Sequence, residues 1–561
     1  MAYLQSVGVQ ITETDLTTVA QPTSASIGAY VGHFNWGPVD EITNISSEKN
    51  LGEIFETPKQ AGDPNAESFL TAESFLKYGN SLKVVRCVGA GALNAAGESG
   101  YTTGPGVLIK NKEDYNLKIA TLLDAFYARC PGAIGNTLEV KLFHANNEAT
   151  LAAERKQYFD LAPSTTTWAS SVSTTVYTND EIHIAVFDKN GEFTGVKGAV
   201  LETFQGLSLN ANAKTVSGAS NYFVNVLNNG SSYVFAGDPA IVRTLASSTY
   251  TLAGTGIYGF NAGADGTRVA ANVVTALNIF ADIETVDINL LFAEAFTSDT
   301  TVNVKLNGVV VGRKDCMAFL SAPLNLYTQT SETAKKNAVI AAKAAISDPS
   351  SYVVFDSTPV YVYNKYADDY KWIPACGHIA GLCAYTDSVA DAWFSPAGYN
   401  RGQLRGVTKL AYNPVQVDRD ELYATNINPI VNTAGQGIVL LGDKTGQSRA
   451  SAFDRINVRR LFNSLQRACG IAAKFQLFEL NDEFTRSAFV NTIEPLLRDV
   501  QSRRGVTDYR IVCDETNNTP QVIDTNRFIA DIYIKPSRSI NYITLNFVAS
   551  RSGIQFNEIG A

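Results

Sequence analysis

The chain begins with an alternation of apolar and polar residues in which Val7, Val9 and Ile11 occupy every second position. A period of two is typical of a strand, because successive side chains of a strand point to opposite faces. The dipeptide Gln21-Pro22 follows, and the residue before a proline avoids the helical conformation. No turn and second strand adjoin this segment, so residues 1–22 are predicted to form an extended arm.

A compact α/β unit is predicted in residues 23–97. The apolar runs 27–31 and 82–88 have the composition of buried strands, and residues 48–55 and 67–78 have helical patterns between them. Strands that alternate with helices favour a sheet with parallel elements.

Short alternating strands separated by turns are typical of residues 98–240. Examples are 137–143 and 182–187, and turn signals occur at Asp188-Lys-Asn-Gly191 and Asn228-Asn-Gly230. Ser/Thr-rich segments here carry few core-forming side chains. These features predict an antiparallel β insertion with surface-exposed loops.

The pattern changes to βα between residues 241 and 355. A strand is predicted at 286–292, and an Ala/Lys-rich helix at 332–346 leads into a strand at 352–355. A first helix is indicated by the spacing of Val269, Val273, Leu277 and Phe280. We expect an inserted βα middle domain here.

Two long helices are predicted in the last third. The first covers 456–475, and the second has an apolar face made of Phe489, Ile493, Leu497 and Val500. Pro495 is expected to kink the second helix or to begin a new first turn. Arg503, Arg504 and Gly505 are expected to end it, because cations favour the negative end of a helix and glycine favours the position beyond it.

Strands and a tail are predicted after these helices. The strands are expected at 509–513, 528–534 and 542–549. In the tail 553–559, Ile554 and Phe556 again repeat every second residue, and nothing follows with which they could pair. The tail is therefore predicted to be a second extended arm.

The expected fold class is a mixed α/β multidomain protein of the α+β type. An α/β core domain would carry a βα middle domain and an outward antiparallel β insertion, with extended arms at both ends. The expected domains are an N-terminal arm (1–22), a discontinuous core (23–97 and 356–551), the β insertion (98–240), the middle domain (241–355) and a C-terminal arm (552–561).

Composition narrows the functional classes. The chain has 45 Lys and Arg against 54 Asp and Glu, and its net charge of −9 argues against a general nucleic-acid binder, which needs a basic face. No apolar run reaches the roughly 18 residues that span a bilayer. Met1 to Asp15 shows no secretory signal, so a soluble chain that is not exported is expected. Seven scattered cysteines, an odd number, favour reduced thiols in a cytoplasmic setting.

Two glycine-rich segments lack the context that nucleotide binding requires. Gly254-Thr-Gly256-Ile-Tyr-Gly259 has the dinucleotide-binding spacing, but a long loop follows it in place of a helix. Gly437 to Thr445 resembles a phosphate-binding loop with one extra residue before Lys444, but its middle is apolar and strand-like. No bound nucleotide or other cofactor is therefore expected.

Metal-binding and catalytic motifs are also incomplete. Cys376, His378 and Cys383 supply three soft ligands where structural zinc needs four, which favours buried thiols beside a turn. His33 is interpreted as a packed or capping side chain. Asp188 to Glu192 lacks the glycine and the distal glutamate of a calcium loop, which favours a hairpin turn. With four histidines and neither H-E-x-x-H nor G-x-S-x-G, no catalytic or metal-binding residue is expected.

Short motifs recur in a fixed order along the chain. The first part contains Gly8-Val-Gln-Ile-Thr-Glu13, Gly32-His-Phe-Asn-Trp36-Gly37-Pro38, a helix-to-strand step from Gly79 to Arg86, Pro131-Gly-Ala-Ile-Gly135-Asn136 and Gly263-Ala-Asp265-Gly266. The last third contains Trp393 to Gly402, Arg455-Ile-Asn457-Val-Arg459-Arg460-Leu, Glu479 to Arg486 and Cys513-Asp514-Glu-Thr-Asn517-Asn518-Thr519. Together they resemble the tail sheath proteins of contractile bacteriophages. The chain departs at Pro374-Ala-Cys376-Gly377, where that family often has P-P-S-G, and the resemblance is weak in 98–240.

The resemblance implies a structural role. Such subunits form hexameric rings stacked helically around a tail tube, and contraction drives the tube through the host envelope for genome delivery. The core would polymerise and the insertion would face outward. The implied partners are further copies of the chain, the tail tube protein, and baseplate and tail terminator proteins, without direct nucleic-acid contact or membrane insertion. The implied location is the virion tail, after assembly in the host cytoplasm.

The resemblance also suggests roles for particular residues. The arm residues Val7, Val9, Ile11, Ile554 and Phe556 are expected to add strands to sheets of neighbouring subunits. Arg498, Arg503 and Arg504 are candidates for facing an acidic tube surface, and the alternative is that they only cap the helix and stay solvated. Two other functions remain open: the sheath of a phage-tail-like bacteriocin or injection particle, and an α/β enzyme.

Overall fold

The computed structural model describes residues 26–99, 106–172, 177–246, 249–296 and 300–541. Contacts divide the chain into two compact units. We call Thr23–Ala392 with Pro396–Arg459 the large unit, and Trp393–Ser395 with the residues from Arg460 onward the C-terminal unit. Both predicted arms, and the predicted strand 542–549, lie outside the described residues.

A six-stranded sheet forms the centre of the large unit. Five of its strands are parallel, and β2 pairs antiparallel with β3 at one edge. In spatial order the strands are β15 (Val353–Phe355), β14 (Met317–Leu320), β13 (Leu290–Ala293), β1 (Gly28–His33), β3 (Leu82–Cys87) and β2 (Ile42–Ile45). The chain adds β3 on one side of β1 and β13 to β15 on the other, so the strand order reverses at β1.

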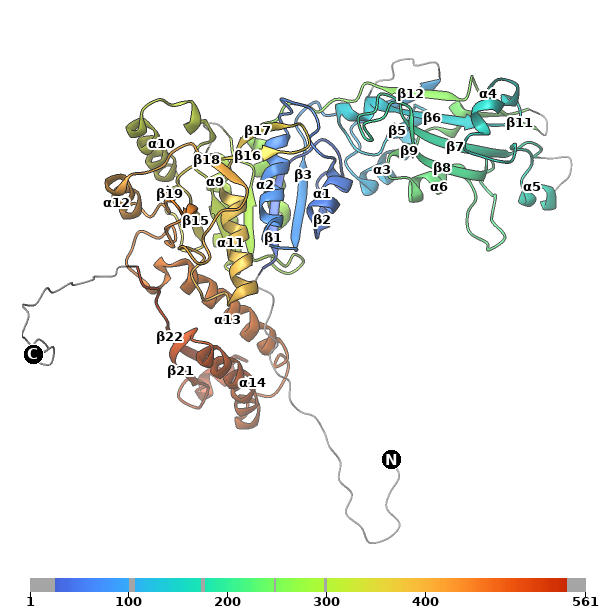
Figure 1. The fold of residues 1–561 in the computed structure, drawn as a ribbon. Helices are drawn as coiled ribbons and strands as arrows, with labels where there is room; N and C mark the ends of the chain where they lie inside the picture. The colour runs from blue at the N-terminus through green and yellow to red at the C-terminus, as the bar shows by residue number, and fades with distance from the viewer. Residues whose placement is uncertain (1–25, 100–105, 173–176, 247–248, 297–299, 542–561) are drawn as a thin grey trace, which may run out of the picture. The chain divides into compact units, whose positions relative to one another are not determined.

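Helices pack on both faces of this sheet. One face is covered by α2 (Ala66–Leu76) and α11 (Cys376–Val389), which lie side by side next to β1 (Figure 1). The other face is covered by α8 (Ala270–Ala276), α9 (Thr301–Arg313) and α10 (Glu332–Ala344). Every residue of β1 is buried, as expected for parallel strands that are covered on both sides.

The helices predicted around this sheet are present with close bounds. α1 (Glu48–Phe55) begins where the side chain of Ser47 accepts a hydrogen bond from the Asn50 amide. α10 begins in the same way at Ser331, whose side chain accepts from the Ala334 amide. In both helices a serine satisfies one of the amides that a helix start leaves unpaired. α9 was not predicted, because Gly308 and Gly312 interrupt its helical pattern.

A seven-stranded antiparallel sheet forms the second part of the large unit. Its strands in spatial order are β8 (Ala199–Ser208), β7 (Glu181–Asp188), β6 (Leu138–Phe143), β12 (Ile257–Asn261), β4 (Ala96–Ser99), β5 (Phe126–Ala128) and β9 (Val234–Ala236). Around it lie α3 (Lys112–Lys118), α4 (Glu148–Arg155), α5 (Thr167–Val172), α6 (Phe223–Gly230), α7 (Pro239–Val242) and the hairpin of β10 (Arg243–Ala246) and β11 (Thr249–Leu252).

One turn predicted in this part is wrong. Asn228-Asn-Gly230 ends helix α6 instead of connecting two strands. The Asn228 side chain donates to the Tyr115 hydroxyl at 2.5 Å and accepts from the Ala236 amide at 2.9 Å. These tertiary bonds fix the segment as a helix end, which the local sequence could not show.

The observed sheets do not follow the predicted boundaries at 98, 240 and 355. The antiparallel sheet includes β4 and β12, so it extends beyond 98–240 at both ends. Strands β13 to β15, predicted to form a separate middle domain, extend the sheet that contains β1 and β3. Parallel pairing joins segments far apart in sequence, and local patterns carry no information on it.

The rest of the large unit consists of small sheets and helix α12 (Gln416–Ala424). A three-stranded sheet contains β17 (Asp369–Ile373), β16 (Val360–Asn364) and β18 (Val407–Leu410), and a hairpin contains β19 (Ile430–Thr433) and β20 (Gly437–Leu440).

The C-terminal unit combines two long helices and one short helix with a pair of antiparallel strands, which we call its β hairpin. Its elements are the part of α13 (Ile456–Lys474) from Arg460 onward, α14 (Glu483–Ser502), β21 (Val506–Val512), α15 (Pro520–Asp524) and β22 (Asp531–Pro536). The predicted apolar face of α14 is confirmed, because Phe489, Ile493, Leu497 and Val500 are all buried. The helix continues as one element across Pro495.

The end of α14 differs from the prediction in one respect. The residue in the left-handed conformation is Arg504, with φ 69°, and not Gly505. The Gly505 amide donates to the Val500 carbonyl at 2.8 Å, which closes the helix. A side chain at Gly505 would place its Cβ 2.6 Å from Val500 and 3.0 Å from the Trp393 ring. The glycine is therefore required for close packing, while Arg504 takes the unusual φ.

Candidate functional site

The carboxyl edge of the parallel sheet is the position at which α/β proteins most often bind a ligand. In open α/β sheets, ligands bind beyond the carboxyl ends of the strands, where the strand order reverses. In the large unit this point lies between β1 and β13. His33 ends β1 and Glu294 directly follows β13, and both side chains are buried.

A network of charged side chains occupies this point. His33 Nδ1 lies 2.8 Å from Glu294 Oε2, and the His33 amide donates to the same oxygen at 2.8 Å. Arg268 bonds Glu294 through Nε, and its Nη2 lies 3.1 Å from Glu67 Oε2. Burial raises the pKa of Glu294, but bonds from His33 and the charge of Arg268 outweigh it and hold this pKa below its ordinary value. Burial raises the pKa of Glu67 to about 7 despite Arg268.

The guanidinium of Arg86, near the end of the neighbouring strand β3, also donates hydrogen bonds to the backbone of the protein. Its side chain is 1% exposed. Nε donates to the Phe34 carbonyl at 2.9 Å, and Nη1 donates to the Gly37 carbonyl at 2.7 Å. Nη2 donates to the Pro131 carbonyl at 2.7 Å, which connects this edge to the part of the chain that forms the antiparallel sheet.

The same pattern continues at the end of β15. Asp356 is fully buried, and its Oδ1 accepts from the Ala322 amide at 2.9 Å. Burial raises the pKa of Asp356 to about 7. Many of the polar groups at this sheet edge therefore bond to one another and to the backbone, although His33 Nε2, Glu67 Oε1 and Asp356 Oδ2 are buried without a hydrogen-bond partner among the described residues.

The two glycine-rich segments have the non-nucleotide context predicted for them. Gly254 to Gly259 connects β11 to β12 and enters β12, and the next helix starts only at Ala270. Gly437 begins strand β20 of a hairpin, and Lys444 Nζ donates to the Tyr423 carbonyl at 2.7 Å. Neither segment forms the strand–loop–helix unit that cradles phosphates.

The thiols of Cys376 and Cys383 are buried as predicted, but the predicted turn beside them is wrong, because this segment forms helix α11. Cys376, His378 and Cys383 are buried along α11. His378 Nδ1 lies 3.2 Å from the Tyr78 hydroxyl, and burial lowers the pKa of His378 to about 3. Within the described ranges, no three His, Cys, Asp or Glu side chains are grouped as metal ligands, and none of the described helices could cross a membrane.

Asp188 is the centre of a hairpin turn, as predicted. Its carboxylate accepts from the amides of Gly191, Glu192, Phe193 and Thr194, at 2.8 to 3.0 Å. It also accepts from the Thr137 hydroxyl at 2.8 Å. Its oxygens are therefore occupied by the turn that follows β7.

The predicted tube-facing arginines lie at the end of α14. The Arg498 side chain is 71% exposed and lies 2.7 Å from Glu494. Arg503 lies 3.7 Å from Asp499 and over the Trp393 ring, and Arg504 is exposed. The structure thus brings the three arginines to one helix end with exposed side chains.

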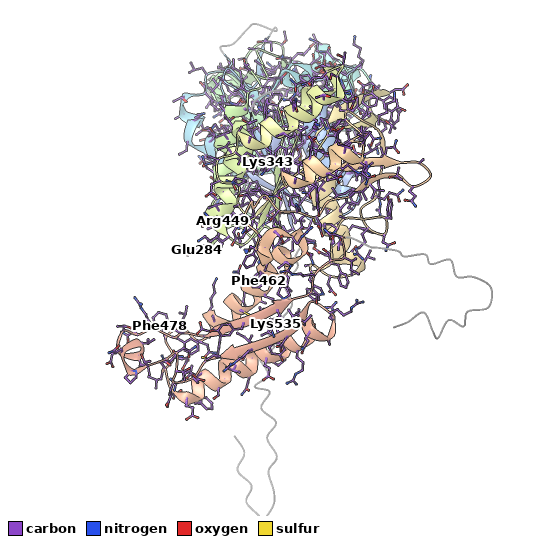
Figure 2. The ribbon with its side chains drawn as sticks, turned by 90° about the vertical axis from the view of Figure 1, so that its left-hand side faces the viewer. Glu284, Lys343, Arg449, Phe462, Phe478 and Lys535 are labelled. Atoms are coloured by element: carbon purple, nitrogen blue, oxygen red, sulfur yellow. The ribbon has the colours of Figure 1, made fainter. Side chains whose placement is uncertain are left out.

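Sequence reasoning missed an exposed apolar segment, residues 475–484, which comprises the connection from α13 to α14 and the first two residues of α14, and which we call the apolar loop. Its large side chains are strongly exposed: Phe475 68%, Leu477 64%, Phe478 105%, Leu480 78% and Phe484 81%. Figure 2 shows Phe478 at one end of the C-terminal unit. The signal was present in the sequence, because this run lies between two helices that each have an apolar face of their own.

The β hairpin of the C-terminal unit is another open feature. Among the described residues, β21 and β22 pair only with each other. A two-stranded sheet is marginal alone and has an outer edge on each strand. With the apolar loop, this hairpin gives the C-terminal unit the features of an association surface.

Comparison with solved structures shows which proteins share this fold. The sheath tail protein of Listeria innocua matches with a TM-score of 0.54 at 11% identity, covering 92% of this chain and 96% of that one. The sheath tail protein of Desulfitobacterium hafniense matches with a TM-score of 0.54 at 12% identity, covering 95% and 100%. The fold is therefore that of sheath tail proteins.

Sequence comparison shows the family. Residues 269–446 match the phage tail sheath protein central domain, and residues 448–550 match the phage tail sheath C-terminal domain. The tail sheath protein of Vibrio phage KVP40 is 33% identical over 688 aligned positions, which cover 99% of both chains. That of Enterobacteria phage T4 is 32% identical, also over 99% of both. The chain belongs to the phage tail sheath protein family.

Proposed function

We propose that the chain is the repeating subunit of a contractile phage tail sheath, in which hexameric rings stack helically around an inner tube. Contraction of the sheath drives the tube through the host envelope and delivers the genome. The observation that carries this proposal is the 33% identity to a phage tail sheath protein over 99% of both chains. The relatives from Vibrio phage KVP40, Enterobacteria phage T4 and Salmonella phage ViI favour a phage over a bacteriocin or injection particle.

The role is structural and not catalytic. What supports this is the carboxyl edge of the parallel sheet, where the charged side chains of His33 and Arg268 are both engaged by Glu294. On this proposal the chain contributes surfaces, and the energy of contraction comes from a difference in contacts between copies in two packings.

Extended arms join neighbouring copies. Val7, Val9 and Ile11 at one end, and Ile554 and Phe556 at the other, alternate as strands do. The outer edges of β21 and β22 offer unpaired backbone groups among the described residues. Main-chain hydrogen bonds between the arms and such edges hold neighbours together while the large units change their mutual contacts.

Other partners follow from the same proposal. The tail tube lies inside the sheath, and exposed Arg498, Arg503 and Arg504 suit an acidic tube surface. Baseplate and terminator proteins meet the two ends of the polymer. The antiparallel sheet faces outward, the sheath is part of the virion tail, and assembly takes place in the host cytoplasm.

Negative-stain electron microscopy of the purified chain tests the proposal. Incubation at rising protein concentration, with and without purified tail tubes, should give hollow cylinders with transverse striations. A chain that stays folded and monomeric under all of these conditions, with its own tube present, would contradict the proposed function.

A further inference from the structure

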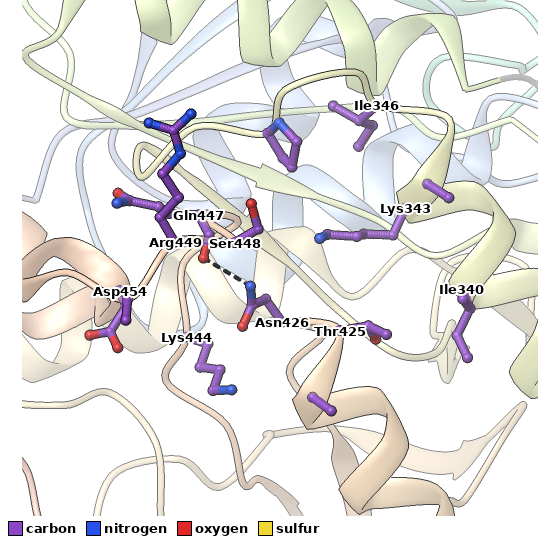
Figure 3. A pocket seen from close by; sticks show the side chains of 14 residues that line it. Ile340, Lys343, Ile346, Thr425, Asn426, Lys444, Gln447, Ser448, Arg449 and Asp454 are labelled. Atoms are coloured by element: carbon purple, nitrogen blue, oxygen red, sulfur yellow. Dashed lines mark hydrogen bonds between the residues drawn. The ribbon is translucent and has the colours of Figure 1, made fainter.

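A pocket of about 530 Å³ lies in the large unit, between the ends of α10 and α12 and residues 444–454 (Figure 3). Part of its wall is apolar, formed by Ile340, Ile346 and Pro349. The same wall carries the cations Lys343, Lys444 and Arg449 and one carboxylate, Asp454. Its size lies in the range of about 300–1,000 Å³ that encloses a compact ligand or several side chains.

Two of these cations lack a partner within the part of the chain that the structure describes. Lys444 donates to the Tyr423 carbonyl, and Asp454 lies 3.7 Å from Arg455. Lys343 and Arg449 make no ion pair and no side-chain hydrogen bond among the described residues. Figure 3 shows the Lys343 ammonium directed toward Ser448. Burial lowers the pKa of Lys343, a cost that a nearby carboxylate would remove.

The end of α10 explains only part of this arrangement. A lysine in the last turn is favoured by the negative end of the helix, which accounts for the position of Lys343. The helix does not account for Arg449 or for an apolar wall beside both cations. The pocket suits an occupant that is apolar in the middle and acidic at its margin.

The apolar loop of the C-terminal unit has this chemistry. Phe478 is 105% exposed and has a φ of 71°, and acidic residues lie around it: Glu479, Asp482 and Glu483. The loop is anchored, because Asn481 Nδ2 donates to the Arg527 carbonyl at 2.8 Å and Arg486 donates to Asn481 Oδ1 at 3.0 Å. Concentrated exposure of large apolar side chains marks an interaction surface.

We propose that the apolar loop of one copy inserts Phe478 into this pocket of a second copy, with Glu479 and its acidic neighbours facing Lys343 and Arg449. The inference rests on the proposed function and adds a named contact to it. Pocket and loop complement each other in polarity and in charge, and neither complements itself. The contact is therefore heterologous, the type that builds rings and open helical polymers instead of closed two-fold dimers.

Separate variants of the loop and the pocket test the contact. The loop variant is Phe478→Asp, and the pocket variant is Lys343→Glu with Arg449→Glu. Each should raise the critical concentration for polymerisation without tubes about tenfold or more, because a buried aromatic anchor dominates an interface. Val216→Asp is the matched control: Val216 is 101% exposed, lies in the antiparallel-sheet part and should assemble as the parent does. Circular dichroism of every variant verifies the fold.

Mixing the two variants reveals the direction of the contact. The loop variant keeps an intact pocket, and the pocket variant keeps an intact loop. An equimolar mixture should sediment as discrete pairs and form no long polymers, while each variant alone stays monomeric. A mixture without pairs would overturn the proposal, because it would mean that loop and pocket do not meet between copies.

Charge reversal supplies the rescue experiment. Glu479→Lys with Glu483→Lys, combined with the pocket variant in one chain, should lower the critical concentration at least about fivefold relative to the pocket variant alone. Unchanged polymerisation of the loop and pocket variants would overturn the contact and leave the proposed function standing. A loop variant impaired only on tubes would also overturn it and assign the loop to the tube. Failure of the parent chain to polymerise at all would instead count against the proposed function.

Discussion

The parallel sheet of the large unit and the β hairpin of the C-terminal unit differ in how far their strands are paired and covered by the rest of the chain. In the sheet, β1 and β14 are buried along their whole length, and helices cover both faces. In the C-terminal unit, β21 and β22 pair only with each other among the described residues, and the apolar loop is exposed. Helices of the same chain cover the first region, and on our proposal a neighbouring chain completes the second.

This difference indicates that the large unit supplies a rigid body and that the C-terminal unit supplies contacts to neighbouring copies. A sheet whose charged ends bond internally, as His33, Glu294 and Arg268 do, has one stable arrangement and can move as a body. Open strand edges and exposed apolar side chains can hold neighbours in more than one relative position. On our proposal, contraction rearranges the contacts between complete bodies and leaves their interiors unchanged.

The largest expected effect, on folding and aggregation, comes from comparing two deletions in the large unit that differ in their end points. Removing 91–266 and joining the ends with a short Gly/Ser linker should leave a folded chain, because Ala90 and Thr267 are bridged neighbours. Removing 98–240, the predicted insertion, should give an aggregating chain, since it cuts β4 after Gly97 and takes away the strands that bury Tyr258 and Phe260 of β12. Size-exclusion chromatography and circular dichroism distinguish the two. Equal behaviour of both variants would mean that the antiparallel sheet does not define the boundary of the segment that can be removed.

Replacing Arg86 by methionine tests whether the large unit depends on its buried charges. The carbonyls of Phe34, Gly37 and Pro131 would lose their donor, and the free energy of unfolding should fall by about 3–5 kcal/mol. Urea unfolding followed by tryptophan fluorescence, to which the buried Trp36 contributes, measures the change. The control Arg498→Met removes a surface ion pair and should change the free energy by less than about 1 kcal/mol. Similar losses in both variants would contradict the difference drawn between the two regions.

Asp356→Asn tests the same region through pH. The pKa of Asp356 is raised in the folded chain from 3.8 to about 7, so the folded state holds an extra proton between these values. Stability should therefore fall as pH rises through this window, at about 1.4 kcal/mol per unit of pKa shift at most.

The asparagine variant should lose this part of the pH dependence. At pH 8 it should be more stable than the parent by about 1–3 kcal/mol, and the difference should disappear near pH 4. Urea unfolding at several pH values measures both chains, with Asp160→Asn, an exposed position, as the control. Parallel stability curves for parent and variant at all pH values would show that Asp356 does not titrate in this range.

The smallest expected effect concerns the exposed arginines of α14. Reversing Arg498, Arg503 and Arg504 to glutamate should weaken assembly on tubes at moderate salt and leave tube-free polymers unchanged. Each exposed contact contributes about 0–1 kcal/mol and is screened by salt, so the defect should diminish as salt rises. Sedimentation of tubes with bound chain measures it. Equal binding by parent and variant at every salt concentration would leave these arginines as helix caps only.

Sequence patterns predicted the local elements well and their assembly poorly. α1 has the predicted bounds 48–55, and the apolar face of α14 is buried as its spacing indicates. The pairing of β13 with β1 was missed, because it joins strands about 260 residues apart and leaves no local mark. Arg504 was missed as the left-handed residue because adjacent Gly505 fits that role by propensity, and the tight packing that claims the glycine is tertiary.

Among the candidate sites, those formed by neighbouring residues could be predicted from the sequence, and those formed by distant segments could not. The incomplete contexts around Gly254 and Lys444 could be read from neighbouring residues, and the structure confirms them. The network of His33, Glu294 and Arg268 could not, because its members come from distant segments. The assembly roles of Val9 and the other arm residues stay predictions, since these residues lie outside the described ranges.

Removal of the arms tests most directly the claim that the C-terminal unit is completed by neighbouring copies. Chains that lack 1–20 or 553–561 should be folded and soluble by circular dichroism and should form no sheaths in electron microscopy. Val9→Pro should act almost as strongly, because proline removes a backbone donor from the added strand, whereas Val9→Ile should assemble normally. If either shortened chain still builds full-length sheaths that contract, neighbouring copies are not joined through their arms, and this account of the connection is wrong.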